Sequence, residues 1–288
     1  MRRYRLIAAD MDGTLFDQSR TVPSRTLEAI RAIQRRQVAF VLATGRMCRS
    51  TLPYAEALAI TTPMICYHGA MIVTPDGARQ LTHRRLDPHL ARSIAMTLES
   101  MGFHINVYVN DVLYVPEYNA RVAAYTDLAQ VEAFVPACWQ RFWDSISHED
   151  PANHPTKLVA IASPEQVAHA EGSLRAIWQG QVWLHSSQPN FLEVCHPLAG
   201  KGQALAWVAK QLGVPLSETV AIGDGCNDHD MLASAGLAVA MGNAHPSLKA
   251  IAHCVTGHVK EAGAATVLEW LLASDRLAQA PAPRDARG

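Results

Sequence analysis

Two carboxylates, Asp10 and Asp12, stand two positions apart near the start of this 288-residue chain. They come at the end of the apolar run RLIAAD (residues 5–10), and a continuous apolar run is typical of a strand covered on both faces. In open α/β sheets ligands bind at the carboxyl ends of the strands, and Gly13 permits a sharp turn there. Because two acids this close repel each other, the pair predicts a bound cation or a shared proton. A solvated acidic turn explains the pair alone equally well.

Three further segments contain residues of types that bind anions or metal ions. Each of these segments lies at the end of a predicted strand or at the start of a predicted helix. The segment TGR (residues 44–46) follows the apolar run VAFVLAT, and a hydroxyl, a glycine amide and a helix N-terminus together suit an anion. Lys201 lies between two glycines at the start of a predicted helix. Asp224, in GDGCND (residues 223–228), follows an apolar strand, and its carboxylate would complete a Mg²⁺ site with Asp10. Taken singly, each segment is ambiguous, since Thr-Gly is an ordinary turn and a lone lysine is more often solvated.

Apolar runs alternate with helical patterns at both ends of the chain, which predicts an α/β fold with a doubly wound (Rossmann-like), mostly parallel sheet. The middle differs: two strands flank residues 110–111, and Ser163 and Gln166 stand at capping-box spacing before a helix. This pattern predicts an inserted α+β domain. We expect a core domain of residues 1–83 and 190–276, an insertion of residues 84–189 and a disordered Ala/Pro-rich tail of residues 277–288.

The composition disfavours several classes of protein, although a local basic patch is compatible with a neutral total charge. Lys and Arg total 25 against 26 Asp and Glu, whereas a duplex nucleic-acid binder needs a basic excess to meet the phosphates. The six cysteines form no Cys-x-x-Cys pair, which disfavours a zinc knuckle or a dense disulfide framework. No apolar stretch approaches the ~20 residues of a membrane span, and the apolar start ends too early, at Asp10, for a signal peptide. We therefore expect a cytoplasmic protein with no nucleic-acid or membrane partner.

Together and in this order, the segments resemble the haloacid dehalogenase-like hydrolases, and within them the Cof-type subfamily with an α/β (type IIB) cap. The size and order of the middle insertion are similar to the larger cap of that family. The resemblance therefore implies a catalytic core and a cap domain that selects the substrate. The matching segments are DMDGTLF (residues 10–16), ATGR (43–46), GKG (200–202), GDGCND (223–228) and MLASAGLAVAMGNA (231–244).

The resemblance also implies a role for each matching residue. Asp10 is expected to attack phosphorus and form an aspartyl-phosphate, and Asp12 is expected to act as general acid and then as general base. The residues expected at a Mg²⁺ cofactor are Asp10, Asp12 through its backbone carbonyl, Asp224 and Gly225, with Asp228 behind them. The residues expected to hold the phosphoryl oxygens are Met11, Thr44, Gly45, Lys201 and Asn227.

One segment departs from the family pattern. Where the relatives commonly have Asn-Gly-Ala, this chain has His68 followed by Gly-Ala. A residue at this place lies at the edge of the site in the family. His68, like Arg46, is therefore a candidate contact for the substrate, and it would give the activity a pH dependence. A hydrogen-bonded turn histidine explains His68 equally well.

The function implied by the resemblance is a Mg²⁺-dependent phosphatase that hydrolyses a small cytoplasmic phosphomonoester through an aspartyl-phosphate. Residues 57–71 and 103–115 are similar to pyridoxal-phosphate and thiamine-pyrimidine-phosphate phosphatases, and the same group includes sugar-phosphate phosphatases. Two other functions stay open: a phosphotransferase or phosphomutase on the same fold, and a ligand-binding protein that has lost catalysis. A dehalogenase is disfavoured, because Asp12, Lys201 and Asp224 together suit a metal-bound phosphate.

Overall fold

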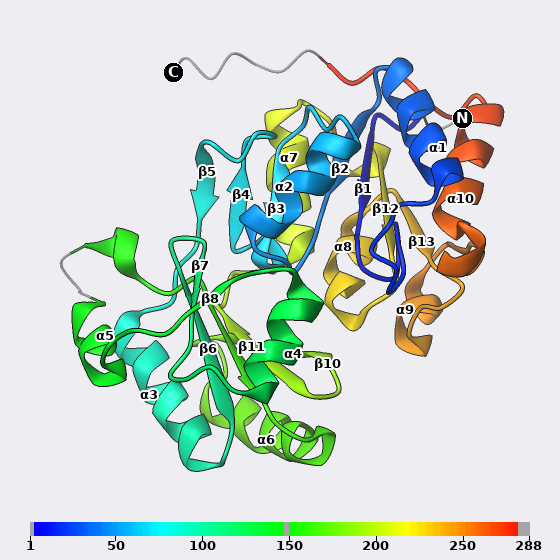
Figure 1. Ribbon diagram of the computed structural model, residues 1–288. Coiled ribbons are helices and arrows are strands. Elements are labelled where there is room, and N and C mark those ends of the chain that lie inside the picture. The colour runs from blue at the N-terminus through cyan, green and yellow to red at the C-terminus, as the bar shows by residue number, and fades with distance from the viewer. Residues whose placement is uncertain (1–2, 147–149, 282–288) are drawn as a thin grey trace. The chain divides into compact units, whose positions relative to one another are not determined.

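The structure, a computed structural model, describes residues 3–146 and 150–281 (Figure 1). The chain forms two compact units. The first contains Met1–Gly45, Thr51–Leu81 and Gly200–Gly288, and the second contains Arg46–Ser50 and Thr82–Ala199. Most of the second unit is therefore inserted between two parts of the first along the sequence. Among the described residues, no helix is long and apolar enough to span a membrane.

A five-stranded parallel sheet forms the centre of the first unit, with the strand order β14-β13-β12-β1-β2. Every side chain of the four longer strands is buried. Because both faces of the sheet are covered, these strands appear in the sequence as continuous apolar runs. The strands are β1 (Leu6–Ala9), β2 (Ala39–Leu42), β12 (Thr219–Gly223), β13 (Leu237–Ala240) and β14 (Cys254–Val255).

Helices lie on both sides of this sheet, as Figure 1 shows, with α1 packed against α10 and α7 packed against α8. The helices are α1 (Ser24–Arg35), α2 (Cys48–Ala57), α7 (Lys201–Gln211), α8 (His229–Ser234), α9 (Pro246–Ile251) and α10 (Gly263–Ala273). Single 3₁₀ turns are η1 (Tyr67–Gly69), η3 (Leu216–Glu218), η4 (Cys226–Asp228) and η5 (Val259–Glu261). A small sheet contains β3 (Met64–Cys66), β4 (Met71–Val73) and β5 (Gln80–His83).

The described part of the C-terminal tail, residues 277–281, makes backbone hydrogen bonds. The Ala278 amide donates to the Tyr4 carbonyl at 2.9 Å, and the Ala280 amide donates to the Gln37 carbonyl at 2.8 Å. Two residues of the segment expected to be disordered, Ala278 and Ala280, are thus hydrogen-bonded to other residues of the first unit. The remaining residues of that segment, 282–288, lie outside the described residues.

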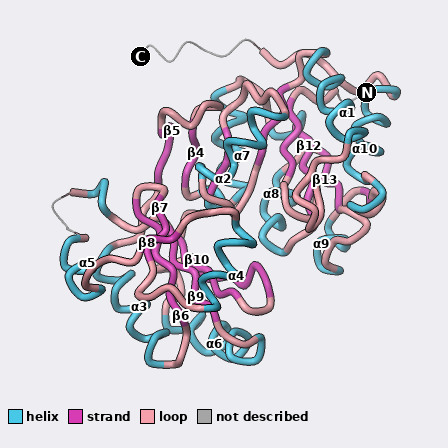
Figure 2. The backbone as a smooth tube through the Cα atoms, viewed as in Figure 1, coloured by secondary structure: helices cyan, strands magenta, loops and turns pink. Residues whose placement is uncertain are grey.

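The second unit is built on a six-stranded sheet with the order β10-β11-β9-β6-β7-β8. Figure 2 shows this second group of strands with helices beside it. All neighbouring strands are antiparallel except β7 and β8, which are parallel. The strands are β6 (His104–Val109), β7 (Val112–Tyr114), β8 (Ala133–Phe134), β9 (Lys157–Ile161), β10 (Trp183–Gln188) and β11 (Phe191–Cys195). The helices are α3 (Pro88–Ser100), α4 (Ala120–Ala129), α5 (Trp139–Ser145), α6 (Pro164–Ile177) and the 3₁₀ turn η2 (Pro151–Asn153).

The two faces of this sheet differ in chemistry. Successive side chains of a strand point to opposite faces, and alternate residues of β6, such as Ile105 and Val107, join an apolar core with α3 and α6. Elsewhere in the sheet, Lys157 of β9 and Glu193 of β11 form a buried ion pair at 2.7 Å.

The predicted α/β fold, with a parallel sheet and an inserted α+β unit, is confirmed.

We expect His83, at the end of β5, to make the protein less stable in acid. Its Nε2 lies 2.8 Å from the Thr156 hydroxyl, and burial lowers the pKa of His83 to about 3. The unfolded chain takes up a proton near the ordinary pKa of about 6.5, whereas the folded protein does not. The free energy of unfolding therefore falls as the pH drops below about 6.5, by about 2 kcal/mol for this group at about pH 5.

Urea unfolding at several pH values measures this effect. His83→Gln should lose less stability than wild type between about pH 7 and about pH 5, because the amide takes up no proton. His89→Gln, an exposed histidine of α3, is the matched control and should behave as wild type. Equal acid losses in wild type and His83→Gln would contradict this expectation.

Candidate active site

Loops that follow four parallel strands meet at one edge of the sheet in the first unit. Since β1 pairs in register with both β2 and β12, these strands end at nearly the same level. Ligands of α/β sheets bind at this edge. The polar residues that follow the strands are Asp10 after β1, Thr44 after β2, Asp224 after β12 and Asn243 after β13.

Lys201 joins two carboxylates at this edge. Its Nζ donates to Asp10 Oδ1 at 2.5 Å and to Asp228 Oδ1 at 2.6 Å, and the lysine side chain is completely buried. The lysine begins α7, and the next residue, Gly202, lies against α8: a Cβ there would stand 2.4 Å from the Asp230 carbonyl oxygen. The Gly202 amide also donates to Asp230 Oδ2 at 2.8 Å. Glycine after the lysine therefore lets α7 approach closely enough to place Lys201 between the carboxylates.

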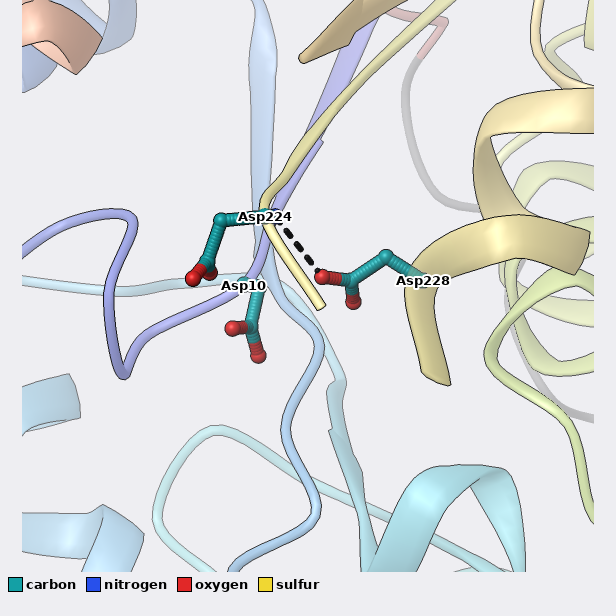
Figure 3. A group of neighbouring side chains, drawn as sticks. All are labelled: Asp10, Asp224 and Asp228. Atoms are coloured by element: carbon teal, nitrogen blue, oxygen red, sulfur yellow. Dashed lines mark hydrogen bonds between the residues drawn. The ribbon is translucent and has the colours of Figure 1, made fainter. Parts of the chain in front are cut away.

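Asp228 supports the loop that carries Asp224. Figure 3 shows Asp228 directing its carboxylate toward the backbone of Asp224. Asp228 Oδ2 accepts hydrogen bonds from the amides of Asp224 and Gly225, each at 3.0 Å. Asp228 Oδ1 accepts from Lys201. Both oxygens of this fully buried carboxylate therefore have donors, which is the arrangement that a buried charge requires.

The Asp224 side chain is held by donors at both of its oxygens. Thr14 Oγ1 donates to Asp224 Oδ1 at 2.9 Å, and Asn243 Nδ2 lies 3.2 Å from Asp224 Oδ2. Gly13 packs directly against this carboxylate, since a Cβ at Gly13 would stand 2.2 Å from Asp224 Oδ2. Gly13 also has a φ of +82°, which L side chains rarely adopt. Both reasons require glycine at this position.

The carboxylates and the lysine shift one another's pKa values. Burial and the Asp228 carboxylate raise the pKa of Asp10 well above its usual value, although Lys201 opposes this shift. Burial and the Asp228 carboxylate also raise the pKa of Asp224 to about 7. Burial favours the neutral form of Lys201, but the carboxylates of Asp10 and Asp228 outweigh it and raise the pKa of the lysine. The lysine therefore remains protonated while its neighbours repel one another.

This group of residues fits a divalent cation. Asp10, Asp224 and Asp228 each offer a carboxylate oxygen, and these oxygens all lie within 4.8 Å of one another. The Lys201 ammonium contacts two of these carboxylates, and burial together with repulsion from the Asp228 carboxylate raises the pKa values of Asp10 and Asp224. Oxygen ligands of this kind suit Mg²⁺. Asp10 and Asp224 were expected as metal ligands from the sequence, whereas Asp228 was expected behind them, and the ligand set itself stays a prediction.

His68, Gly45 and Asn227 come together beside this edge. His68 Nδ1 lies 3.3 Å from Asn227 Nδ2, and a Cβ at Gly45 would stand 2.1 Å from the His68 ring. His68 and Tyr67 have φ values of +55° and +51°, which are uncommon and strained for residues other than glycine. The buried His68 ring is therefore packed on the loop after β2 by a strained turn.

The structure also locates the other predicted residues. Met11 is buried, and its carbonyl accepts hydrogen bonds from the amides of residues 14–16, which closes the turn after β1. Asp12 is exposed on this turn, and Thr44 is buried at the end of β2. Arg46 belongs to the second unit. Contacts of these residues with a substrate stay predictions.

Three residues of the site were not singled out from the sequence. Thr14 and Asn243 hold the Asp224 carboxylate, and Asp230 accepts the hydrogen bond from the start of α7. Thr14 and Asn243 lie inside segments that resemble the family, DMDGTLF and MLASAGLAVAMGNA. Their presence in those segments was the available signal, but the sequence did not show which partner each side chain contacts.

Comparison with known proteins identifies the family. A model of the haloacid dehalogenase-like hydrolases matches residues 7–268. Phosphatase YwpJ of Bacillus subtilis is 34% identical over 286 residues, which cover 93% of this chain and 100% of that protein. HMP-PP phosphatase of Serratia proteamaculans is 28% identical and covers 96% and 99% of the two chains. A solved haloacid dehalogenase-like hydrolase from Bacillus subtilis has a TM-score of 0.81 and 30% identity, over 92% of this chain and 99% of that one.

The match begins within β1 and ends within α10, and it therefore covers most of the first unit and the whole of the second. The prediction of a hydrolase acting on phosphoric monoesters is confirmed at the level of the family, as is the resemblance to its Cof-type members. The chain belongs to the haloacid dehalogenase-like hydrolases.

Proposed function

We propose that this protein is a Mg²⁺-dependent phosphatase that hydrolyses a small phosphomonoester through a phosphorylated Asp10. The observation that carries the proposal is the contact between the buried ammonium of Lys201 and the carboxylate of Asp10, at the ligand-binding edge of the sheet. A carboxylate and a phosphate repel each other, and nearby positive charge offsets that repulsion. The relatives named as phosphatases support the same reaction class.

The proposed metal site uses oxygens from two loops. The residues proposed to hold Mg²⁺ are Asp10, the backbone carbonyl of Asp12, Asp224 and the neighbouring Gly225. Asp228 is placed behind these ligands, because its carboxylate is completely buried and accepts hydrogen bonds from Lys201 and two backbone amides, whereas Asp224 is partly exposed. Bound there, Mg²⁺ would neutralise charge on the phosphoryl oxygens.

The proposed reaction has two displacements at phosphorus. The Asp10 carboxylate forms a bond to phosphorus as the bond to the ester oxygen breaks, and Asp12 donates its proton to the departing alkoxide. Asp12 then takes a proton from water, the hydroxyl oxygen bonds to phosphorus, and the bond to Asp10 breaks. The products are the alcohol and inorganic phosphate, and both aspartates return to their starting forms. Asp12 is exposed on its turn, so it is open to a leaving group and to water.

The phosphoryl oxygens need donors that are already in place before reaction. Lys201 is fixed by Asp10 and Asp228, and Asn227 is held beside His68. The residues proposed to bind the phosphoryl oxygens are Met11, Thr44, Gly45, Lys201 and Asn227.

We assign substrate selection to the second unit, as a cap, together with Arg46 and His68. The substrate classes proposed from the resemblance are sugar phosphates, pyridoxal phosphate and thiamine-pyrimidine phosphates. The similarity to HMP-PP phosphatase of Serratia proteamaculans supports including the last class. Proteins with the same fold act on many different substrates, so the fold does not identify the substrate. The measured kcat/KM of this protein for each class must decide among them.

Phosphate release from a panel of phosphomonoesters tests the proposed function. The panel contains the three substrate classes, nucleotides and a chromogenic aryl phosphate, each with Mg²⁺ and with EDTA. We expect release with Mg²⁺ and loss of release in EDTA, and the ranking of kcat/KM shows how selective the enzyme is. Transfer to an added sugar acceptor in place of phosphate release would identify a phosphotransferase. Absence of both reactions with every substrate would contradict the proposal.

Asp224→Asn is expected to weaken metal binding more than it disturbs the fold. A neutral amide is a poorer Mg²⁺ ligand than a carboxylate, so the Mg²⁺ concentration for half-maximal activity should rise at least about tenfold. Because the pKa of Asp224 is about 7, wild type must release a proton to bind Mg²⁺ below that pH. The rise in melting temperature that Mg²⁺ causes should therefore be larger at about pH 8 than at about pH 6 in wild type.

The matched control is Asp17→Asn, a carboxylate in the loop that follows the Asp12 turn. This variant should keep the wild-type Mg²⁺ dependence. An unchanged Mg²⁺ dependence in Asp224→Asn would show that Asp224 is not a metal ligand.

A further inference from the structure

Asn243 contacts two loops of the site at the same time. Its Nδ2 donates to the Gly13 carbonyl at 2.8 Å, in the turn after β1, and lies 3.2 Å from Asp224 Oδ2, in the loop after β12. Its Oδ1 accepts a hydrogen bond from the Val259 amide at 2.9 Å. One amide side chain therefore links the turn that carries Asp12 to the Asp224 carboxylate and is itself anchored on the other side.

The backbone that carries Asn243 is firmly attached to its surroundings. The Met241 amide donates to the Gly223 carbonyl at 3.0 Å, and the His245 amide donates to the Asp224 carbonyl at 2.9 Å. Between them, Gly242 leaves no room for a side chain, since a Cβ there would stand 2.7 Å from the His258 amide nitrogen. The loop after β13 thus follows the loop after β12 closely, and the position of Asn243 is set by backbone contacts on both sides of it.

The Asp224 carboxylate would rotate more freely without this contact. Thr14 holds one of its oxygens and Asn243 approaches the other, so the two donors fix the plane of the carboxylate. The proposed ligands come from two separate loops, and these include the backbone carbonyl of Asp12 after β1 and the carboxylate of Asp224 after β12. A cation needs these oxygens at fixed separations, and residues that orient the ligands commonly change metal affinity 10- to 100-fold, roughly, when removed.

We infer that Asn243 is a positioning residue for the divalent cation: it sets the distance between the Asp12 turn and the Asp224 carboxylate. This inference rests on the proposed function, because it assumes that these two groups bind the metal. Asn243 is not assigned a contact with the substrate or with the reacting atoms. Its removal should therefore weaken metal binding and leave the rate at saturating metal nearly unchanged.

The test is direct binding of Mn²⁺ to the purified protein, measured from the paramagnetic resonance signal of the free ion. We expect the Kd of Asn243→Ala for Mn²⁺ to rise at least about tenfold over wild type. In activity assays the half-saturating Mg²⁺ concentration should rise by a similar factor, and kcat at saturating Mg²⁺ should stay within about threefold. If Asn243→Ala does not fold, Asn243→Ser, whose hydroxyl is too short to reach both partners, is measured with the same expectation.

Thr256→Val is the matched control for a purely structural effect. The Thr256 hydroxyl donates to the Gly263 carbonyl at 2.7 Å, near η5, and among the described residues it has no hydrogen bond to the Asp12 turn or to Asp224. This variant should lower the melting temperature and keep the wild-type Kd for Mn²⁺. An unchanged Kd in a folded Asn243→Ala protein would overturn the inference and leave the proposed function standing. Failure of wild type to bind Mn²⁺ would overturn the metal site and the inference together.

Discussion

Replacing Asp10 with asparagine is expected to lower the rate of phosphate release by at least about 10⁴-fold, because an amide is not a nucleophile toward phosphorus. The side chains have nearly the same shape, so packing around β1 should be preserved. Burial and neighbouring carboxylates raise the pKa of Asp10, which means that the ionised form costs folding free energy above its usual pKa. In metal-free buffer near pH 7, Asp10→Asn should therefore melt at the same temperature as wild type or at a higher one.

Phosphate release measures the expected loss of activity, and melting followed by circular dichroism measures the expected melting temperature. Both are recorded on the same preparations. Asp17→Asn changes a carboxylate that lies outside the Asp10, Asp224 and Asp228 group and should retain wild-type activity. Activity of a folded Asp10→Asn protein within about tenfold of wild type would exclude Asp10 as the nucleophile.

Replacing Lys201 with methionine is expected to remove activity and to destabilise the protein by about 3–5 kcal/mol. The lysine side chain is completely buried between Asp10 and Asp228, and methionine keeps its unbranched shape, one atom shorter, without its charge. Two buried carboxylates then lack their counter-ion and must either remain charged at high cost or take up protons. Because protonation relieves the cost, the loss of stability should be larger at about pH 8 than at about pH 5.

Urea unfolding at the two pH values measures this change. Lys210→Met is the matched control, because Lys210 is exposed near the end of the same helix, α7. Its effect on the free energy of unfolding should stay within about 0.5 kcal/mol. A Lys201→Met protein as stable as the control at both pH values would contradict the role of Lys201 as the buried counter-ion.

The sheet of the first unit could be predicted because its strands are covered on both faces. Runs such as residues 5–10 and 38–44 contain apolar residues without alternation, and that pattern depends only on local sequence. The start of α6 could also be predicted from local sequence, because Ser163 and Gln166 form the capping box that their spacing predicts. In contrast, α4 and β8 carried weak signals, because α4 buries only three side chains and β8 has two residues.

Contacts between residues far apart in sequence were beyond prediction. The Asp111 carboxylate accepts hydrogen bonds from the amides of Cys48 and Arg49, at 2.9 and 2.8 Å, and so caps the start of α2 from more than sixty residues away. The segment Arg46–Ser50 accordingly belongs to the second unit, whereas the sequence placed it in the core domain. No local pattern records such a contact, because it depends on the conformation of the turn between β6 and β7.

The order of the motifs was enough to expect Asp10, Lys201 and Asp224 at one edge of the sheet, since parallel strands end together. The sequence did not show that Lys201 contacts Asp228 as well as Asp10. It also did not show that Thr14 and Asn243 hold the two oxygens of Asp224. These contacts depend on side-chain directions in loops, which spacing alone does not determine.

The central claim is that the phosphoryl group passes through Asp10, and trapping that group on the protein tests it most directly. Wild type is mixed with Mg²⁺ and a radiolabelled phosphomonoester that it hydrolyses, quenched in acid within the first turnover, and digested for peptide sequencing by mass spectrometry. We expect covalent label on the peptide that contains Asp10, at Asp10 itself, and no label in Asp10→Asn. Label on a different residue, or full product formation within that turnover with no labelled protein at any quench time, would contradict the proposed mechanism.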